Sequence, residues 1–325
     1  PHEEPALSST TPPALPDKPR RSKLPIVIGV AIVAIVAIVA IVVTLVVRNS
    51  GDDTATTAAG GEAQTVRIGV TDQAEPYWKT YVAKAQSELG VEVELVNFSD
   101  YSLPNPALKQ GEVDLNQFQH VQYLANYNVE AGDDLQPIGA TAVYPLPLYS
   151  TTVDEPGQFA PGATIAIPND AINEARALLV LQAAGLLTLE GGGNAFSTTD
   201  DVQDAKVEVT ALDASQTANA LQSGSAAGAV VNNNYATSAG LSPEDIVFQD
   251  DPSSSSAAPY VNLFVSRAED AGNRTYLDLA ALIHDPEVQA EFVKSYPQAV
   301  VRDTDAAALQ QDLADVEQDA RAAQG

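Results

Sequence analysis

The 325-residue sequence contains no cysteine and no methionine. Without cysteine the chain forms no disulfide, has no thiolate nucleophile or cysteine-ligated zinc, and offers no cysteine for attachment of a lipid. The lack of methionine has two explanations that the sequence leaves open. One is a general bias of the composition toward Ala, Val, Asp and Thr. The other is selection for low sulfur content in a protein made when sulfur amino acids are scarce.

Basic residues are also few, with 16 Lys and Arg against 43 Asp and Glu, for a formal net charge of −27. This balance argues against nucleic-acid binding, which needs clustered basic side chains, and against adsorption to anionic lipid. A large negative charge instead favours a soluble, exported domain. The length, with 45% hydrophobic residues, is sufficient for one large or two medium folded domains.

Catalytic and metal-binding patterns are missing as well. The chain has three histidines and contains no HExxH, P-loop or GxSxG motif. The triple glycine at 191–193 is interpreted as a surface loop, and the acidic pairs Asp200–Asp201 and Asp250–Asp251 as solvated loop residues. The sequence therefore predicts a protein that is not an enzyme, with no catalytic residues, no metal site and no cofactor.

The one long hydrophobic run, Leu24–Val47, carries no charge. Its 24 residues would form a helix of about 36 Å, enough to cross a hydrocarbon core of about 30 Å. A cleavable signal peptide is the alternative, but its apolar region is usually only about 7–15 residues long. We therefore expect an uncleaved, single-pass signal anchor in the plasma membrane.

The flanking segments orient this predicted span. Residues 1–23 are rich in Pro, Ser and Thr and end in a basic cluster, which predicts a disordered cytoplasmic tail. Everything after the span would then be extracytoplasmic. Residues 48–64 are small and polar and predict a flexible linker that reaches about 20–25 Å as a coil.

From residue 65 onward, strand and helix patterns alternate, which is typical of α/β folds with parallel sheets. The first series predicts strands at 66–70, 91–98 and 113–115 and helices at 76–89, 105–110 and 118–127. The second predicts strands at 165–167, 206–212, 228–231 and 260–265 and helices at 170–184, 215–223 and 286–295, followed by an acidic terminal helix within 303–324. Two series suggest two lobes, with a ligand cleft at the carboxyl ends of the strands.

Three segments near those strand ends carry binding chemistry. Asn173 and Arg176 lie three residues apart, on one face of a helix that Asp170 can cap. An arginine there can hold a carboxylate, helped by the helix N-terminus. The alternative is a surface arginine paired with Glu174 or another acid.

Phe118, His120 and Tyr123 form an aromatic group after a predicted strand. Such a group suits an apolar or thioether side chain, although all three could also be ordinary core residues. Asn232 follows a buried apolar strand, and Asn262 interrupts an apolar run. Buried amides need partners, which a ligand ammonium or a local turn would supply.

Taken in chain order, these segments resemble the methionine-binding, NlpA-type family of ABC-importer lipoproteins across about residues 66–300. The resemblance is carried by Asp100-Tyr101-x-x-Pro104-Asn105, Asp114 to His120 with Tyr123-Leu124, Val143-Tyr144-Pro145, Ala166 to Asp170 with Asn173 and Arg176-Ala177-Leu178, Val231-Asn232 with Tyr235-Ala236, and Pro259 to Leu263.

This resemblance implies an α/β, two-lobed periplasmic-binding-protein fold of type II. Lobe 1 would comprise residues 65–145 and 259–302, lobe 2 residues 146–258, and residues 303–325 an acidic extension. Arg176 would hold the carboxylate of L-methionine, and Asn173, Asn232 and Asn262 its amino and carboxylate groups. The residues implied around its side chain are Tyr101, Phe118, His120 and Tyr123.

The implied partners are the permease and ATPase subunits of an ABC importer, with the protein itself a monomer. Family members usually carry a lipid-anchored cysteine, and here the membrane helix would replace it. Two alternatives remain open. The ligand would be another small amino acid or a methionine-containing dipeptide, or the protein would be a membrane-anchored sensor that presents its ligand to a receptor.

Overall fold

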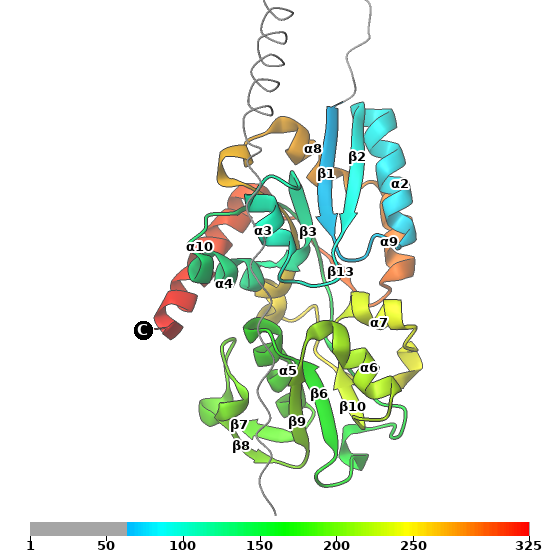
Figure 1. The fold of residues 1–325 in the computed structure, drawn as a ribbon, viewed down its shortest axis with the longest axis vertical. Helices are drawn as coiled ribbons and strands as arrows, with labels where there is room; N and C mark the ends of the chain where they lie inside the picture. The colour runs from blue at the N-terminus through cyan, green and yellow to red at the C-terminus, as the bar shows by residue number, and fades with distance from the viewer. Residues whose placement is uncertain (1–63, 325) are drawn as a thin grey trace, which may run out of the picture. The chain divides into compact units, whose positions relative to one another are not determined.

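The computed structural model describes residues 64–324 (Figure 1). The predicted cytoplasmic tail, the predicted span Leu24–Val47 and nearly all of the predicted linker lie outside these residues. Within the described part of the chain, no helix is both long enough and apolar enough to cross a membrane.

Two separate sheets organise residues 64–324. The larger has the order β13-β4-β12-β3-β1-β2. Its strands are β1 (Gln64–Val70), β2 (Val91–Asn97), β3 (Leu115–His120), β4 (Gln136–Val143), β12 (Val261–Ser266) and β13 (Val300–Val301). β1 runs parallel to β2 and β3, whereas β12 runs antiparallel to both β3 and β4.

The smaller sheet has the order β11-β5-β10-β6-β9. Its strands are β5 (Pro147–Tyr149), β6 (Thr164–Pro168), β9 (Glu208–Leu212), β10 (Gly228–Val230) and β11 (Ile246–Gln249). A hairpin of β7 (Leu187–Leu189) and β8 (Val202–Ala205) lies beside it. Parallel pairs are present in both sheets, as expected, but each sheet is mixed, because β5 is antiparallel to β10 and β11 and β12 is antiparallel to β3 and β4. The chain leaves the larger sheet through β4 and returns through β12, so these neighbours run in opposite directions.

Helices cover both sheets. Those beside the larger sheet are α2 (Pro76–Lys84), α3 (Pro104–Lys109), α4 (Val121–Ala131), α8 (Arg274–Leu282), α9 (Pro286–Ser295) and α10 (Ala306–Gln324). Those beside the smaller are α5 (Ala171–Ala183), α6 (Thr217–Gln222) and α7 (Asn233–Ala239) (Figure 1).

Several predicted helix boundaries are confirmed, and each is set by residues at the end of the helix itself. Asp170 caps α5 by accepting from the Asn173 N–H at 3.0 Å, and Gly185 follows that helix at φ 73°.

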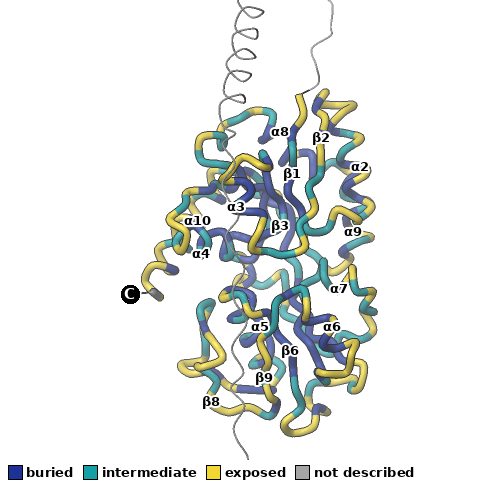
Figure 2. Tube along the Cα trace, in the orientation of Figure 1, coloured by how far each residue is buried: buried dark blue, intermediate teal, exposed yellow. Residues whose placement is uncertain are grey.

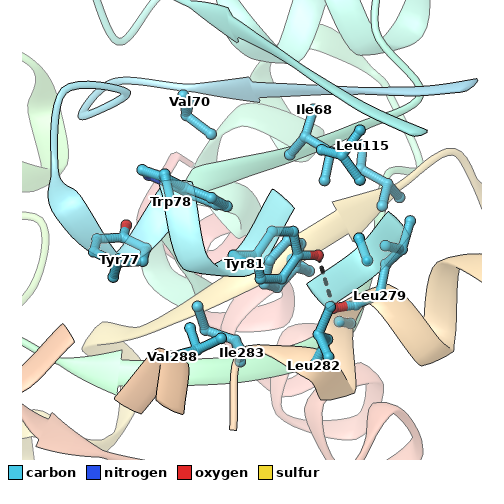
Figure 3. Packing of buried hydrophobic residues seen from close by; sticks show 14 of the residues in the cluster. Ile68, Val70, Tyr77, Trp78, Tyr81, Leu115, Leu279, Leu282, Ile283 and Val288 are labelled. Atoms are coloured by element: carbon cyan, nitrogen blue, oxygen red, sulfur yellow. Dashed lines mark hydrogen bonds between the residues drawn. The ribbon is translucent and has the colours of Figure 1, made fainter. Parts of the chain in front are cut away.

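An aromatic core fills the space between β1 and helices α2, α8 and α9 (Figure 3). Trp78 and Tyr81 on α2 are almost fully buried and pack edge-to-face at 5.2 Å. The hydroxyl of Tyr81 donates to the carbonyl oxygen of Leu279 at 2.8 Å, which satisfies the only polar atom of this side chain. Burial of these large rings fixes α2, and with it the loop that leaves β1, against the sheet.

The acidic terminal segment forms α10, which packs against α4 and β4. Leu309 and Leu313 are buried, whereas the opposite face of the helix is exposed (Figure 2). Asn128 of α4 donates to Glu317 at 2.9 Å, which adds a polar contact to this packing.

One strand and one helix were predicted in the wrong place. The strand expected at 113–115 is β3, Leu115–His120, and the helix expected from Phe118 starts only at Val121. Polar residues obscure this strand in the sequence. Asn116 and Gln119 are buried, and they bond to each other and to Asn105. The ring Nδ1 of His120 then caps α4 by accepting from the Tyr123 N–H at 3.1 Å.

Candidate functional site

A cavity lies where elements of the two sheets meet, and its walls come from segments far apart in the sequence. Residues of β3, α5 and the loops that follow β1, β4 and β10 contribute to it. All eight residues singled out from the sequence line this one cavity, namely Tyr101, Phe118, His120, Tyr123, Asn173, Arg176, Asn232 and Asn262.

Arg176 is a buried cation, only 5% exposed, on the second turn of α5. Its Nε and Nη2 lie 2.9 Å from Oδ2 of Asp250, and Nη2 also donates to the carbonyl oxygen of Tyr144 at 2.8 Å. The guanidinium lies over the ring of Tyr260, 4.2 Å from its centroid. Nη1 has no bonded acceptor among residues 64–324, so two N–H groups of a fixed guanidinium are available to an anion.

The alternative of a surface arginine paired with Glu174 or another acid is met only in part. The partner is another acid, Asp250, but Arg176 is buried, and Glu174 instead accepts from the Thr199 N–H at 3.0 Å. Asp250 is not simply a solvated loop acid, because it also accepts from the Leu146 N–H at 2.7 Å. The neighbouring Asp251 is exposed, as expected.

A chain of amides leads from the start of α5 to the cavity. Asn173 donates through Nδ2 to Asp170 at 2.9 Å, and its Oδ1 accepts from Nδ2 of Asn232 at 3.0 Å. The remaining oxygen of Asn232 is buried and has no partner within the described residues. A buried acceptor without a donor is costly, and a ligand N–H would satisfy it. Asn262 reaches the same cavity from β12, where it is paired in register with His120.

Aromatic rings form another wall. The ring of Tyr101 lies 6.0 Å from Phe118 and 6.4 Å from Tyr123, measured between centroids. His120 packs edge-on against Tyr260 at 5.1 Å. Burial, with the nearby positive charge of Arg176, lowers the pKa of His120 to about 3. The ring is therefore neutral, and since Nδ1 accepts from Tyr123, the imidazole proton resides on Nε2.

Side chains from α7 close the rim of the cavity against the larger sheet. Asn234 accepts from the hydroxyl of Tyr101 and donates to the carbonyl oxygen of Thr71 at 3.5 Å. Tyr235 donates to the carbonyl oxygen of Ser99 at 3.1 Å. These contacts join the elements of the two sheets across the cavity mouth.

Sequence reasoning missed several lining residues, among them Asp72, Tyr144 and Tyr296. The carboxylate of Asp72 accepts from Tyr77 at 2.7 Å, from Trp78 at 2.8 Å and from Tyr296 at 2.9 Å. Its place just after the first strand was a usable signal, because ligands of α/β sheets bind at such ends. The contribution of Tyr296, more than 200 positions away, had no local signal. Residues 64–324 contain no cluster of His, Asp and Glu suited to a metal ion.

Comparison with solved structures identifies the fold. The structure of the methionine-binding protein MetQ has a TM-score of 0.69 and 32% identity, and the match covers 74% of this chain and 99% of that one. A nutrient-binding protein from Burkholderia cenocepacia, solved bound to methionine, has a TM-score of 0.66 and 32% identity, with coverage of 73% and 99%. These likenesses support the expected α/β, two-lobed periplasmic-binding-protein-like fold.

Comparison of sequences identifies the family. A probable D-methionine-binding lipoprotein MetQ of Pasteurella multocida is 35% identical over 257 residues, which is 77% of this chain and 91% of that protein. The D-methionine-binding lipoprotein MetQ of Escherichia coli K12 is 38% identical over 208 residues, or 63% and 75% of the two chains. The family model for NlpA lipoproteins matches residues 66–304. The resemblance is thus confirmed, and the chain belongs to the NlpA lipoprotein family.

Proposed function

We propose that this protein is the solute-binding component of an ABC importer and that it captures methionine. The observation that carries the proposal is the convergence of a buried arginine, an unsatisfied amide oxygen and a group of aromatic rings on one cavity. The names of its sequence relatives and the methionine-bound structural relative support the same ligand. Binding and release, rather than a chemical reaction, is the activity.

In this proposal the free Nη1 edge of Arg176 binds the ligand carboxylate. Asn173, Asn232 and Asn262 provide acceptors and donors for its amino and carboxylate groups. The methionine side chain would lie against the aromatic wall, because thioether sulfur makes favourable contacts with aromatic rings. The residues assigned to that wall are Tyr101, Phe118, His120 and Tyr123.

We further infer that the two sheets belong to two lobes of a type II binding protein. Lobe 1 would comprise residues 65–145 and 259–302, lobe 2 residues 146–258, and α10 a terminal addition. Ligand binding favours the closed arrangement only to the extent that it contacts both lobes. The permease and ATPase subunits would receive the closed, monomeric protein and open it.

The location of the protein follows from the sequence. Residues 24–47 would anchor it in the plasma membrane, with residues 1–23 in the cytoplasm and the binding domain outside. The relatives named as lipoproteins support an extracytoplasmic, membrane-attached domain.

The direct test is to identify the ligand. Small molecules released from the denatured, purified domain would be analysed by mass spectrometry, and L-methionine, D-methionine and glycyl-L-methionine titrated calorimetrically into ligand-free protein. We expect methionine to be released and to bind with a micromolar or lower dissociation constant. Absence of binding by all three compounds would refute the proposed ligand class.

A further inference from the structure

Asp72 is the only carboxylate among the residues that line the cavity. It lies two residues after the end of β1, beyond the carboxyl end of the strand. Its Oδ2 accepts from two hydroxyls, those of Tyr77 and Tyr296, whereas among residues 64–324 a single side chain, the indole N–H of Trp78, donates to Oδ1. Since a carboxylate oxygen can accept about two hydrogen bonds, Oδ1 retains one acceptor position.

Of the two charged side chains that line the cavity, Arg176 has an ion-pair partner and Asp72 has none among its hydrogen-bond donors. Arg176 and Asp250 compensate each other as an ion pair. The three donors to Asp72 are all neutral groups, so its negative charge has no such partner among them. Burial raises the pKa of Asp72 despite these hydrogen bonds, which means that its ionised form costs stability in the folded protein. A charged group kept at such a cost beside a cavity is typical of a binding function.

Tyr144 connects Arg176 with Asp72, because it contacts Arg176 directly and Asp72 through Tyr296. The carbonyl oxygen of Tyr144 accepts from Arg176, and the ring of Tyr144 packs at 5.0 Å against the ring of Tyr296, which donates to Asp72. The cavity therefore has a cationic and an anionic group along one wall. This arrangement matches a ligand that carries a carboxylate and a primary ammonium.

We propose that Asp72 binds the primary ammonium of the ligand whose carboxylate is held by Arg176. The inference rests on the proposed function and adds a charged specificity residue to it, since the cavity asparagines supply only neutral acceptors. Two sources provide this chemistry, the α-ammonium of a free amino acid and the N-terminal ammonium of a dipeptide that ends in methionine. Tyr77, Trp78 and Tyr296 act as positioning residues that hold the carboxylate in place.

The experiment compares two versions of each ligand in which only the ammonium changes. L-Methionine is paired with its 2-hydroxy analogue, and glycyl-L-methionine with glycolyl-L-methionine. Each is titrated into the wild type and into Asp72→Asn. We expect the substitution to weaken binding of the ammonium ligand by about 10- to 100-fold, as for loss of a charge-assisted hydrogen bond, and binding of its hydroxyl analogue by less than about threefold.

A larger loss of affinity for the ammonium ligand than for its hydroxyl analogue is the coupling that identifies which ammonium Asp72 binds. Coupling in the methionine pair assigns Asp72 to the α-ammonium, and coupling only in the dipeptide pair assigns it to the peptide N-terminus. Equal effects on ammonium and hydroxyl ligands in both pairs would overturn the inference while leaving methionine capture intact. Failure of the wild type to bind any of the four compounds would overturn both.

Two further variants separate binding from folding. Asp114→Asn removes a partly buried acid of the same sheet that pairs with Arg67, outside the cavity, and should change no affinity by more than about twofold. Asp72→Ser repeats the test with a smaller side chain if Asp72→Asn does not fold. The unfolding temperature of each variant without ligand, together with its far-UV circular dichroism, establishes that it is folded before the titrations are compared.

Discussion

Arg176 shows how one side chain acquires a function from its surroundings. A free arginine samples many rotamers, but this guanidinium is held by Asp250, by the carbonyl oxygen of Tyr144 and by the face of Tyr260. Because the guanidinium is already ordered in the ligand-free protein, binding does not bear the entropic cost of fixing this side chain, which favours tight binding of a carboxylate. Asp250 and Tyr144 thus contribute to the site by holding the arginine in place.

Replacement of this arginine is the first prediction. Arg176→Gln should weaken methionine binding by about 100-fold or more, because the ligand carboxylate loses its only cationic partner. Calorimetry and the ligand-induced shift in unfolding temperature measure the effect. Arg67→Gln is the matched control, since Arg67 pairs with Asp114 away from the cavity. A full ligand-induced shift in Arg176→Gln would refute the role of this residue.

His120 leads to a prediction about pH. Its pKa is lowered to about 3 in the folded protein, against about 6.5 in an unfolded chain. Between these values the unfolded state binds the proton and the folded state does not, so the contribution of His120 to stability is complete above about pH 6.5 and declines as the pH falls.

Denaturant unfolding at pH 7 and pH 5 tests this linkage. We expect the free energy of unfolding to fall less between the two pH values in His120→Asn than in the wild type, since asparagine can also cap α4. An imidazole resonance of His120 that titrates between pH 5 and pH 8 in the folded protein would contradict the explanation.

At the scale of secondary-structure elements, the start of α5 links helix formation to binding. Asp170 caps this helix and also holds the amide of Asn173, which in turn accepts from Asn232. One capping residue therefore orients two side chains of the cavity. A second helix, α9, begins in the same way, because Asp285 accepts from the N–H of Glu287 at 2.8 Å, but it lies outside the cavity.

These two caps provide a matched pair of variants. Asp170→Ala and Asp285→Ala should each lower the free energy of unfolding by about 0.5–2 kcal/mol, the usual cost of a lost cap. Asp285→Ala additionally removes an ion pair with Lys84 at 3.0 Å. Only Asp170→Ala should also weaken methionine binding, by about tenfold. Equal affinities in the two variants would show that the amide chain does not contribute to binding.

At the scale of the whole binding domain, α7 provides contacts between the two sides of the cavity rim. The hydroxyl of Tyr235 donates to the carbonyl oxygen of Ser99 across the rim. Tyr235 is not among the lining residues, but its ring packs at 5.0 Å against that of Tyr101, and loss of the hydroxyl alone leaves this packing in place. We therefore expect the hydroxyl to influence affinity through closure of the rim.

Removal of the Tyr235 hydroxyl tests how much this contact across the rim contributes to affinity. Tyr235→Phe should weaken methionine binding about 2- to 10-fold, because a hydrogen bond across the closed rim contributes about 0.5–1.5 kcal/mol. Small-angle scattering of the ligand-free protein should show a larger radius of gyration than that of the wild type. Tyr127→Phe is the control. It removes a hydroxyl of α4 that donates to Asp133, and it should change neither the affinity for methionine nor the radius of gyration.

The extent of prediction from sequence differed between elements. Helix starts and stops at Asp170, Gly185 and Asp285 were predicted correctly because capping depends on a few adjacent residues. The position of β3 was wrong because its buried polar side chains bond to one another, which a search for apolar runs cannot detect. Strand direction was partly wrong because it depends on where the chain re-enters a sheet.

The sequence by itself determined the alternating α/β pattern and the caps of the main helices, which depend on local periodicity and on a few adjacent residues. It also pointed to eight of the side chains that line the cavity, seven from residue types near strand ends and Tyr101 from the family resemblance alone. Only the tertiary structure decided that Asp250 pairs with Arg176 and that Asp72 lies among Tyr77, Trp78 and Tyr296. Those partners lie up to 224 positions apart in the chain, and only packing of the folded chain brings such distant groups together.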